Sequence, residues 1–416
     1  MIKILLLYKV KMKKYFQVFL LLITSVQVHA QRIDTIIGKI QQYQFKKLQQ
    51  FARAYKKPDK LKDGIQTATL KEVGIDEKII KMMEDSITAG NYPNIHSVLI
   101  LRNNKLVYEN YFPGKDEIRG TEFLDVVQHH RDTLHDVRSV TKSVVGTAVL
   151  IALGQGKIKS VQQSVFDFFP EFAEYKTDMK RHLTIDHLLN MTAGFEWNEE
   201  KSDTTNYERR MNRSADGIGF VLSLPLVDTP GKKYKYNGGC TQLLAAIVEK
   251  ATGMPVDKFT DQFLFKPLDI GKYAWVKNRD GNPSAASGLR MRSRDMAKFG
   301  LLCMKKGKWN GKQIIPAHLM AQTLKSQVST PFKYTGIPHV GYSKQFWIYT
   351  EILQGKKVTY VQCQGNGGQI ILMDPKTKLG LIITAGNYNL ANLRKSSYEI
   401  YPDFIYPAVM RGSKKP

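Results

Sequence analysis

Residues 139–142, Ser-Val-Thr-Lys, are the segment of this chain best suited to nucleophilic chemistry. They form its single Ser-x-x-Lys sequence and lie where a polar stretch passes into the apolar run 144–151. That pattern predicts a helix, on which positions i and i+3 share a face, so the Lys142 amine can reach the Ser139 hydroxyl. A serine hydroxyl needs a base to remove its proton, and we expect partial desolvation and neighbouring cations to lower the pKa of Lys142 so that it serves as this base. The helix N-terminus would direct N–H groups at a developing oxyanion.

An ordinary helix start gives the same four letters, with Ser139 as the capping residue and Lys142 in solvent. The chain lacks the motifs of several other chemistries. It contains no Gly-x-Ser-x-Gly elbow, no P-loop, no Gly-x-Gly-x-x-Gly and no His-Glu-x-x-His. Its nine histidines include the adjacent pair His129 and His130, but none shows metal-ligand spacing. The sequence therefore predicts no metal and no organic cofactor.

Residues 136–146 closely resemble the nucleophile segment of the serine β-lactamase and penicillin-recognising family, in particular its class C-like branch. That branch includes carboxylesterases, D-amino-acid peptidases and nylon-oligomer hydrolases. Further segments similar to stretches of the same family are 183–194, 230–253 and 287–300. The resemblance covers about residues 66–408 and implies a serine hydrolase that works without a metal or cofactor and forms an acyl-enzyme at Ser139.

The second motif of that family, Tyr-x-Asn, is matched in part by Tyr236-Asn237-Gly238. By the resemblance, Tyr236 exchanges protons with Ser139, Lys142 and the leaving group. The third-position amide is missing, because Gly238 stands there. Asn237 is a candidate for the lost contact, although adjacent side chains on a turn point in different directions.

The third motif, Lys-Thr-Gly or His-x-Gly on a strand that faces the nucleophile, aligns with residues 365–369. Asn366 then replaces the family's cation, which should weaken capture of a substrate carboxylate such as that of a β-lactam. Gly367 and Gly368 would let an acyl group approach the strand edge. The backbone N–H of Gln369 would complete the oxyanion hole with that of the nucleophile. A glycine-rich turn without chemical function is the alternative.

The order of the expected elements predicts an α+β fold. Apolar β-branched runs predict two β-hairpins, and helical periodicity predicts one helix before the first hairpin and a long one from Ser139. The ranges are 73–86 for the first helix, 96–101 with 106–111 for one hairpin, and 369–373 with 380–385 for the other. We therefore expect an antiparallel sheet built from both chain ends, flanked by helices and carrying a mostly helical inserted subdomain. The resemblance implies the β-lactamase/transpeptidase-like fold, with Trp347 lining the pocket, although an aromatic core strand would look the same.

Composition indicates a globular chain, with 43% hydrophobic and 24% charged residues. The formal charge of +25 comes from 62 Lys and Arg against 37 Asp and Glu. These basic residues are dispersed and are not interleaved with stacking aromatics as in a single-strand binder. We expect a solvated basic surface and no nucleic-acid partner; a basic nucleic-acid binder is the alternative.

The first thirty residues have the features of a secretory signal peptide. They hold five lysines and no acid, an apolar run at 15–26, and Val28-His29-Ala30 before Gln31. The apolar run is shorter than the ~20 residues of a spanning helix, so no stable membrane anchor is expected. The expected domains are a signal peptide at 1–30, a basic helical spacer at 31–65, the hydrolase domain at 66–410 and a tail at 411–416.

Together these features predict an exported serine hydrolase, periplasmic or secreted, that cleaves an ester or amide bond in a small-molecule or peptide substrate. The alternatives are a non-catalytic relative that binds cell-wall peptides, and a D-amino-acid peptidase or β-lactamase proper. Cys240, Cys303 and Cys363 indicate no particular disulfide, and their odd number leaves at least one thiol free. The sequence leaves the oligomeric state open.

Export should remove the first thirty residues. N-terminal sequencing of protein recovered from a periplasmic or secreted fraction is expected to begin at Gln31, because a signal peptidase reads the small residues before it. Recovery of the chain in the membrane fraction with residues 13–26 still attached would contradict this prediction.

Overall fold

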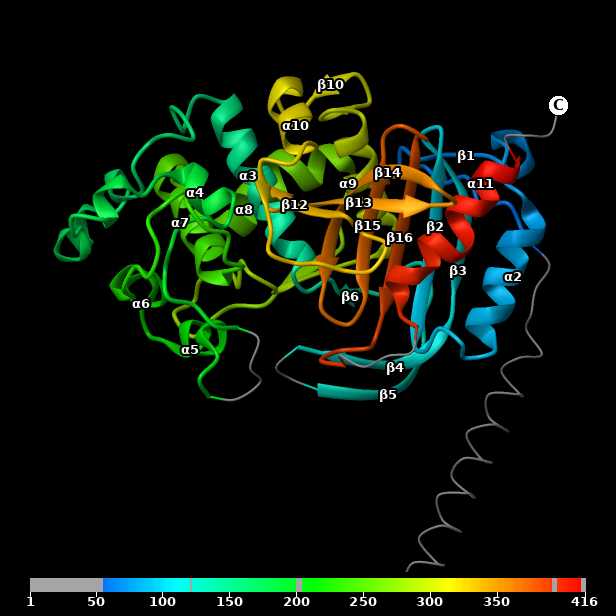
Figure 1. The fold of residues 1–416 in the computed structure, drawn as a ribbon, viewed down its shortest axis with the longest axis horizontal. Helices are drawn as coiled ribbons and strands as arrows, with labels where there is room; N and C mark the ends of the chain where they lie inside the picture. The colour runs from blue at the N-terminus through cyan, green and yellow to red at the C-terminus, as the bar shows by residue number, and fades with distance from the viewer. Residues whose placement is uncertain (1–54, 120–121, 200–203, 391–394, 413–416) are drawn as a thin grey trace, which may run out of the picture. The chain divides into compact units, whose positions relative to one another are not determined.

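The computed structural model describes residues 55–119, 122–199, 204–390 and 395–412. Its centre is a nine-stranded sheet (Figure 1). Across the sheet the strands are β1 (Gln66–Thr67), β3 (Lys105–Tyr111), β2 (Ile95–Arg102), β16 (Leu379–Ala385), β15 (Gln369–Asp374), β14 (Lys356–Gly365), β13 (Phe346–Leu353), β12 (His339–Ser343) and β11 (Val328–Ser329).

The two ends of the chain meet in the middle of this sheet. Strand β16 pairs antiparallel with β2, and Leu381 lies opposite Ile100. This pairing confirms the prediction of an antiparallel sheet built from both chain ends, and both expected hairpins form, as β2–β3 and β15–β16. The exception to the antiparallel pattern is the short strand β1, which pairs parallel with β3.

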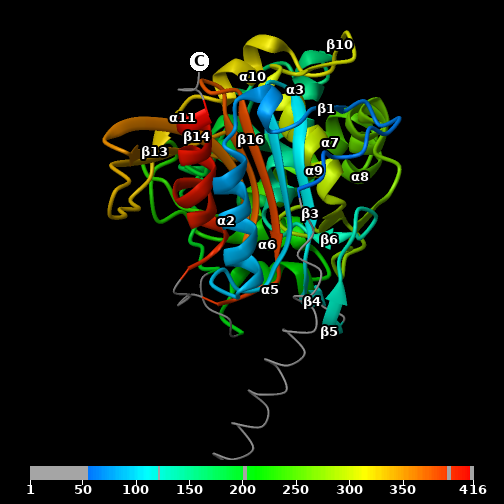
Figure 2. The same ribbon diagram turned by 90° about the vertical axis from the view of Figure 1, so that its right-hand side faces the viewer.

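The central strands are apolar on both faces because each face covers its own hydrophobic core. On β2, Leu99 and Leu101 belong to one core, while Val98 and Ile100 belong to the other. This alternation follows from the two-residue period of a strand. Helices α2 (Glu77–Thr88) and α11 (Tyr406–Gly412) cover one face and lie side by side (Figure 2). Helices α3 (Val140–Gly154) and α9 (Ser293–Met304) cover the other.

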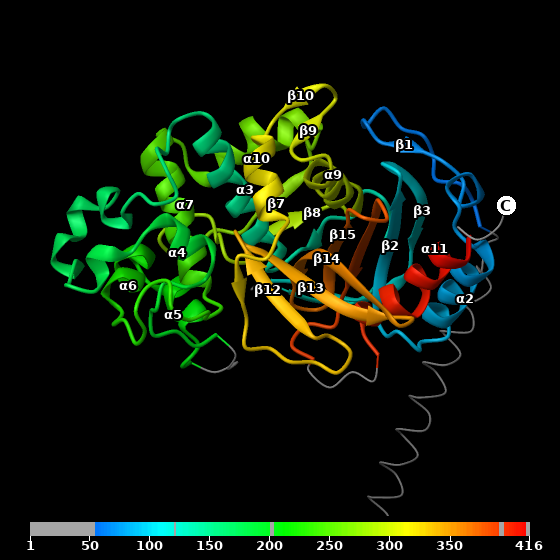
Figure 3. The same cartoon turned by 45° about the horizontal axis from the view of Figure 1, so that its top comes forward.

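A mostly helical subdomain lies on the far side of the sheet from α2 and α11 (Figures 1 and 3). It contains α4 (Ile185–Leu189), α5 (Tyr207–Arg213), α6 (Gly217–Ser223), α7 (Gly238–Thr252) and α8 (Val256–Thr260). Two small sheets have two strands each: β4 (Pro113–Ile118) pairs with β5 (Glu122–Gln128), and β9 (Lys308–Trp309) pairs with β10 (Lys312–Gln313). A third small sheet has the order β6 (His135–Asp136), β8 (Leu289–Met291) and β7 (Tyr273–Trp275). A further helix is α10 (Ala317–Thr323). The inserted helices agree with the expected α+β organisation.

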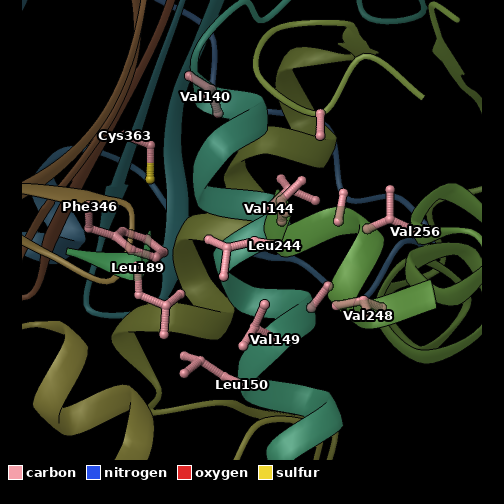
Figure 4. Close-up of a cluster of buried hydrophobic side chains, with 14 of the residues drawn as sticks. Val140, Val144, Val149, Leu150, Leu189, Leu244, Val248, Val256, Phe346 and Cys363 are labelled. Carbon is pink, nitrogen blue, oxygen red and sulfur yellow. The ribbon is translucent and has the colours of Figure 1, made fainter. Parts of the chain in front are cut away.

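Helix α3 joins the sheet to the helical subdomain. Its residues from Val140 to Ala152 are buried and most of them are apolar, as expected for a helix enclosed by other elements. Val144 and Val149 pack against Leu244 and Val248 of α7, and Phe346 of the sheet closes the same cluster (Figure 4). Helix α3 therefore packs against both halves of the fold.

Residues 55–77 differ in part from the sequence-based prediction. The helix expected at 73–86 begins later, at Glu77, because Gly74 adopts a left-handed φ of 68° and Asp76 caps the next turn. Ile65 is buried in the core, and Tyr55 donates a hydrogen bond to the Val107 carbonyl. The predicted signal peptide and residues 31–54 of the predicted spacer lie outside the described residues.

Within the described residues no helix has the length and apolar character needed to cross a membrane. The three cysteines are buried as free thiols.

Candidate active site

Ser139 lies at the N-terminal end of α3, directly after a strained residue. Arg138 has a left-handed φ of 50°, a conformation that costs free energy for a residue with a Cβ. Its side chain pairs with Glu117 and lies over the ring of Tyr388, with 4.4 Å to the ring centroid. These contacts hold the bend that carries the chain from β6 into α3 and fix the position of Ser139.

Lys142 lies one turn further along α3 and reaches the serine. Its Nζ donates to Ser139 Oγ at 3.1 Å and to the carbonyl of Ala286 at 3.0 Å. The lysine is only 1% exposed, and the Ser139 hydroxyl makes no capping hydrogen bond. The alternative of a capping serine followed by a solvated lysine is therefore wrong.

The expected lowering of the lysine pKa is also wrong. Burial by itself lowers the pKa of Lys142, but the Tyr236 phenol and the carboxylates of Glu199 and Glu208 outweigh it and raise this pKa above its ordinary value. Lys142 therefore rests as an ammonium ion. The cations expected to surround it are replaced by carboxylates, one of which, Glu199 Oε1, lies 3.9 Å from Nζ.

Tyr236 faces the same serine and lysine from the segment before α7. Lys142 Nζ lies 4.8 Å from the centre of its ring. Burial raises the pKa of the phenol, and the charge of Lys142 together with the hydrogen bond to Ser139 opposes this only in part. The structure thus brings together the three residues that were predicted to act as one unit.

An aromatic wall stands beside Tyr236. The ring of Trp347 on β13 stacks on it with 5.5 Å between centroids and 28° between planes. Tyr342 meets Trp347 edge to face at 5.0 Å, and Tyr234 lies 6.1 Å from the same indole. Trp347 is only partly buried, so the wall combines core packing with a surface that faces the site.

The missing third-position amide is explained by two carboxylates that the sequence did not predict. A Cβ on Gly238 would lie 3.1 Å from Glu199 Oε2 and 3.2 Å from Glu208 Oε2, so these side chains occupy the space of the lost side chain. Glu199 Oε2 accepts hydrogen bonds from the Gly238 N–H at 2.8 Å and from the Trp197 indole at 2.6 Å. The feature of the sequence that could have indicated these carboxylates is Gly238, which stands where the family has an asparagine side chain.

The second carboxylate belongs to a small charged network. Glu208 Oε1 pairs with Arg119 at 2.8 Å and accepts a hydrogen bond from Ser287. Burial raises the pKa of Glu208, but Arg119, Lys142 and Ser287 outweigh it and lower this pKa to about 2. For Glu199, burial outweighs Lys142 and leaves the pKa raised. Asn237 does not enter the network, because its oxygen accepts the Cys240 N–H as the cap of α7.

The third motif forms a tight turn between β14 and β15. Gly367 and Gly368 have φ values of 90° and 96°, which glycine adopts without strain. The Asn366 side chain is engaged with the loop residue Asn389, donating to its Oδ1 at 3.0 Å and accepting its N–H at 2.8 Å. Gln369 is fully buried and binds the backbone of Ala385 through its amide.

Gly365, the last residue of β14, comes close to the nucleophile segment. A Cβ there would lie 2.3 Å from the carbonyl oxygen of Val137, two residues before Ser139, so only glycine allows this approach. The role of the Gln369 N–H in an oxyanion hole stays a prediction.

Comparison with known proteins finds relatives in one family. A β-lactamase family model matches residues 94–395. An uncharacterised protein of Alkalihalophilus pseudofirmus is 28% identical over 242 residues, which cover 54% of this chain and 62% of the relative. The 6-aminohexanoate-dimer hydrolase of Paenarthrobacter ureafaciens is 26% identical over 281 residues, which cover 62% of this chain and 69% of that enzyme.

Among solved structures, a family VIII carboxylesterase superposes with a TM-score of 0.62 at 15% identity, covering 80% of this chain and 96% of its own. That likeness shows the fold. The match over most of the chain shows the family as well: this chain belongs to the β-lactamase family.

Proposed function

We propose that this protein is an exported serine hydrolase that cleaves an ester or amide bond through an acyl-enzyme at Ser139. The observation that carries the proposal is the 3.1 Å contact between Lys142 Nζ and Ser139 Oγ, beside the ring of Tyr236. The family supports hydrolytic chemistry in general, and the identity of the nucleophile rests on this geometry.

The raised pKa of Lys142 means that the lysine must lose a proton before it can act as the base in acylation. An ammonium ion has no lone pair, so Lys142 accepts the serine proton only after it gives one up. Among the described residues Glu199 has the carboxylate nearest to Lys142 Nζ, at 3.9 Å, and burial raises its pKa, so a neutral acid and a neutral amine form a reachable minor state. In that state Ser139 Oγ bonds to the carbonyl carbon while its proton passes to Lys142.

The remaining steps return the proton. When the tetrahedral intermediate collapses, the bond to the leaving alcohol or amine breaks and the leaving group takes a proton from the lysine and tyrosine pair. Water then adds to the acyl-enzyme, gives its proton to the same pair, and releases the acid with Ser139 restored. Tyr236, with its raised pKa, is a neutral phenol at rest and so is suited to pass a proton in either direction.

The charges of the site favour neutral or amine-bearing substrates over anionic ones. The motif turn presents Asn366 in place of a cation, and two carboxylates, Glu199 and Glu208, lie behind Lys142. Among the residues that the structure describes, the turn offers a substrate carboxylate no matching cation, and the carboxylates behind the lysine give a negative potential. Small esters and amides are therefore the proposed substrate class.

Replacing Ser139 with Ala should abolish labelling of the protein by a fluorophosphonate.

Replacing Tyr236 with Phe should lower kcat for a p-nitrophenyl ester by about 10²–10⁴ if the tyrosine hydroxyl carries the proton. Combining Lys142→Ala with Tyr236→Phe should cost little more than one replacement, because both act on a shared step. Near-normal activity of Tyr236→Phe would show that the ring only packs. Failure of the folded wild-type protein to label would instead favour a non-catalytic binding role.

Glu199→Gln should lower kcat/KM near neutral pH and make it rise with pH. The carboxylate accepts the lysine proton in the proposed first step, so without it Lys142 must lose this proton to solvent, and the neutral amine forms only as the pH increases. The measurement compares pH profiles of wild type, Glu199→Gln and the exposed control Glu174→Gln. A pH profile of Glu199→Gln that matches the wild type would show that Glu199 does not accept the proton of Lys142.

Nitrocefin should be turned over far more slowly than a p-nitrophenyl ester, because Asn366 offers no cation to a carboxylate. Asn366→Lys should shift the ratio of the two kcat/KM values toward nitrocefin, while also breaking the contact with Asn389. Comparable kcat/KM values for both substrates in the wild type would contradict the argument from charge.

A further inference from the structure

Three histidines and one aspartate gather on the sheet side of the nucleophile segment. They are His96 on β2, Asp116 on β4, His129 just after β5 and His135 on β6. All four are buried, with exposures of 0%, 5%, 9% and 1% in that order. Ligand atoms of His96, Asp116 and His129 all lie within 4.8 Å of one another, and His135 Nε2 lies 3.6 Å from Asp116 Oδ1.

The hydrogen bonds around His96 determine which of its nitrogens carries the proton. The Asn94 amide is oriented by Lys115, whose N–H donates to Asn94 Oδ1 and whose carbonyl accepts from Nδ2, each at 2.8 Å. Asn94 Oδ1 is therefore an acceptor, and the His96 Nε2 that lies 3.3 Å from it must be the donor. The other nitrogen of a neutral His96, Nδ1, then carries a lone pair.

The same reasoning applies to His135. Its Nδ1 lies 3.0 Å from the carbonyl oxygen of Asp136, which can only accept, so Nδ1 is the donor and Nε2 carries the lone pair. His96 Nδ1 and His135 Nε2 lie 2.8 Å apart. Two lone pairs at that distance repel each other unless a positive charge lies between or beside them.

His129 supplies a further nitrogen. Its Nε2 is buried and has no hydrogen-bond partner, which is costly for a polar atom in the interior. Its ring lies parallel to that of His96, with 3.9 Å between centroids, so His129 is the ligand that has to turn for its lone pair to join the others. Outer hydrogen bonds from ring N–H groups to carbonyl or amide oxygens, such as those of His96 and His135, are the usual support of metal-binding histidines.

We propose that His96, Asp116, His129 and His135 bind one divalent transition metal ion, with Zn²⁺ as the expected occupant. Three imidazoles and one carboxylate form a ligand set typical of tetrahedral Zn²⁺ sites. Four protein ligands leave no open position, so the site is structural. This departs from the sequence-based prediction of no metal.

The metal would tie together the segments that lead into the active site. His135 lies on the strand just before the bend at Arg138, and the hydroxyl of Tyr388, whose ring packs against Arg138, donates to Asp116 Oδ1 at 3.1 Å. One ion would thus join β2, the β4–β5 hairpin and β6. Its expected effect is on the stability of this region, and the proton transfers at Ser139 do not involve it.

The first test uses the full chain purified without a histidine tag. Elemental analysis is expected to find about one Zn²⁺ per chain, and chelation should lower the Tm. Added Zn²⁺ should restore the Tm in a concentration-dependent way, because a ligand bound by the folded state alone stabilises it. Co²⁺ in place of Zn²⁺ should give the visible absorption of a tetrahedral site. Absence of bound metal, together with no response of the Tm to Zn²⁺, Co²⁺ or Ni²⁺, would overturn the proposal and leave a shared proton between His96 and His135.

The second test uses matched variants. His129→Gln should lower zinc affinity by about 10-fold or more and should lose the cobalt absorption, while His130→Gln, at the exposed neighbouring position, should keep both. Asp116→Asn, which keeps the side-chain shape, should weaken binding in the same way as His129→Gln. Full zinc stoichiometry and unchanged affinity in both ligand variants would place the metal elsewhere and overturn the site.

Discussion

The burial of one lysine ammonium is the constraint on which the active site depends. A cation that is only 1% exposed must be compensated, because desolvating an unpaired charge costs several kcal/mol. The compensation for Lys142 comes from the Ala286 carbonyl, the Ser139 hydroxyl and the carboxylate of Glu199. Each of these groups is held by a different part of the fold, so the charge state of the site depends on the tertiary structure.

The architecture keeps this arrangement rigid. Helix α3 is buried along almost its whole length, so the serine and lysine on its first turns cannot move independently of the sheet and the helical subdomain. The left-handed Arg138 and the close approach of Gly365 to the Val137 carbonyl fix the chain just before the nucleophile. Strain and close backbone contacts at these positions are what pre-organisation requires.

The departures from the family's second and third motifs have different structural consequences. At Gly238 the lost amide is replaced by two carboxylates, which changes the charge behind the lysine. At Asn366 the lost cation is replaced by a neutral side chain engaged with Asn389, which changes what the outer part of the site can bind. Both changes reduce the affinity expected for an anionic substrate group, and together they define the proposed preference for neutral or amine-bearing ones.

The sequence by itself determined several of the elements and the pair of residues proposed to be catalytic. The hairpins at the two chain ends, the buried helix after Ser139 and the i, i+3 contact of Ser139 with Lys142 follow from periodicities of two and 3.6 residues, which are local properties of the chain. The pKa of Lys142, the carboxylates beside Gly238 and the histidine cluster were decided only by the tertiary structure. Electrostatic shifts depend on charges within a few ångströms, and Glu199, Glu208 and the four candidate metal ligands lie on separate elements whose contacts no local pattern encodes.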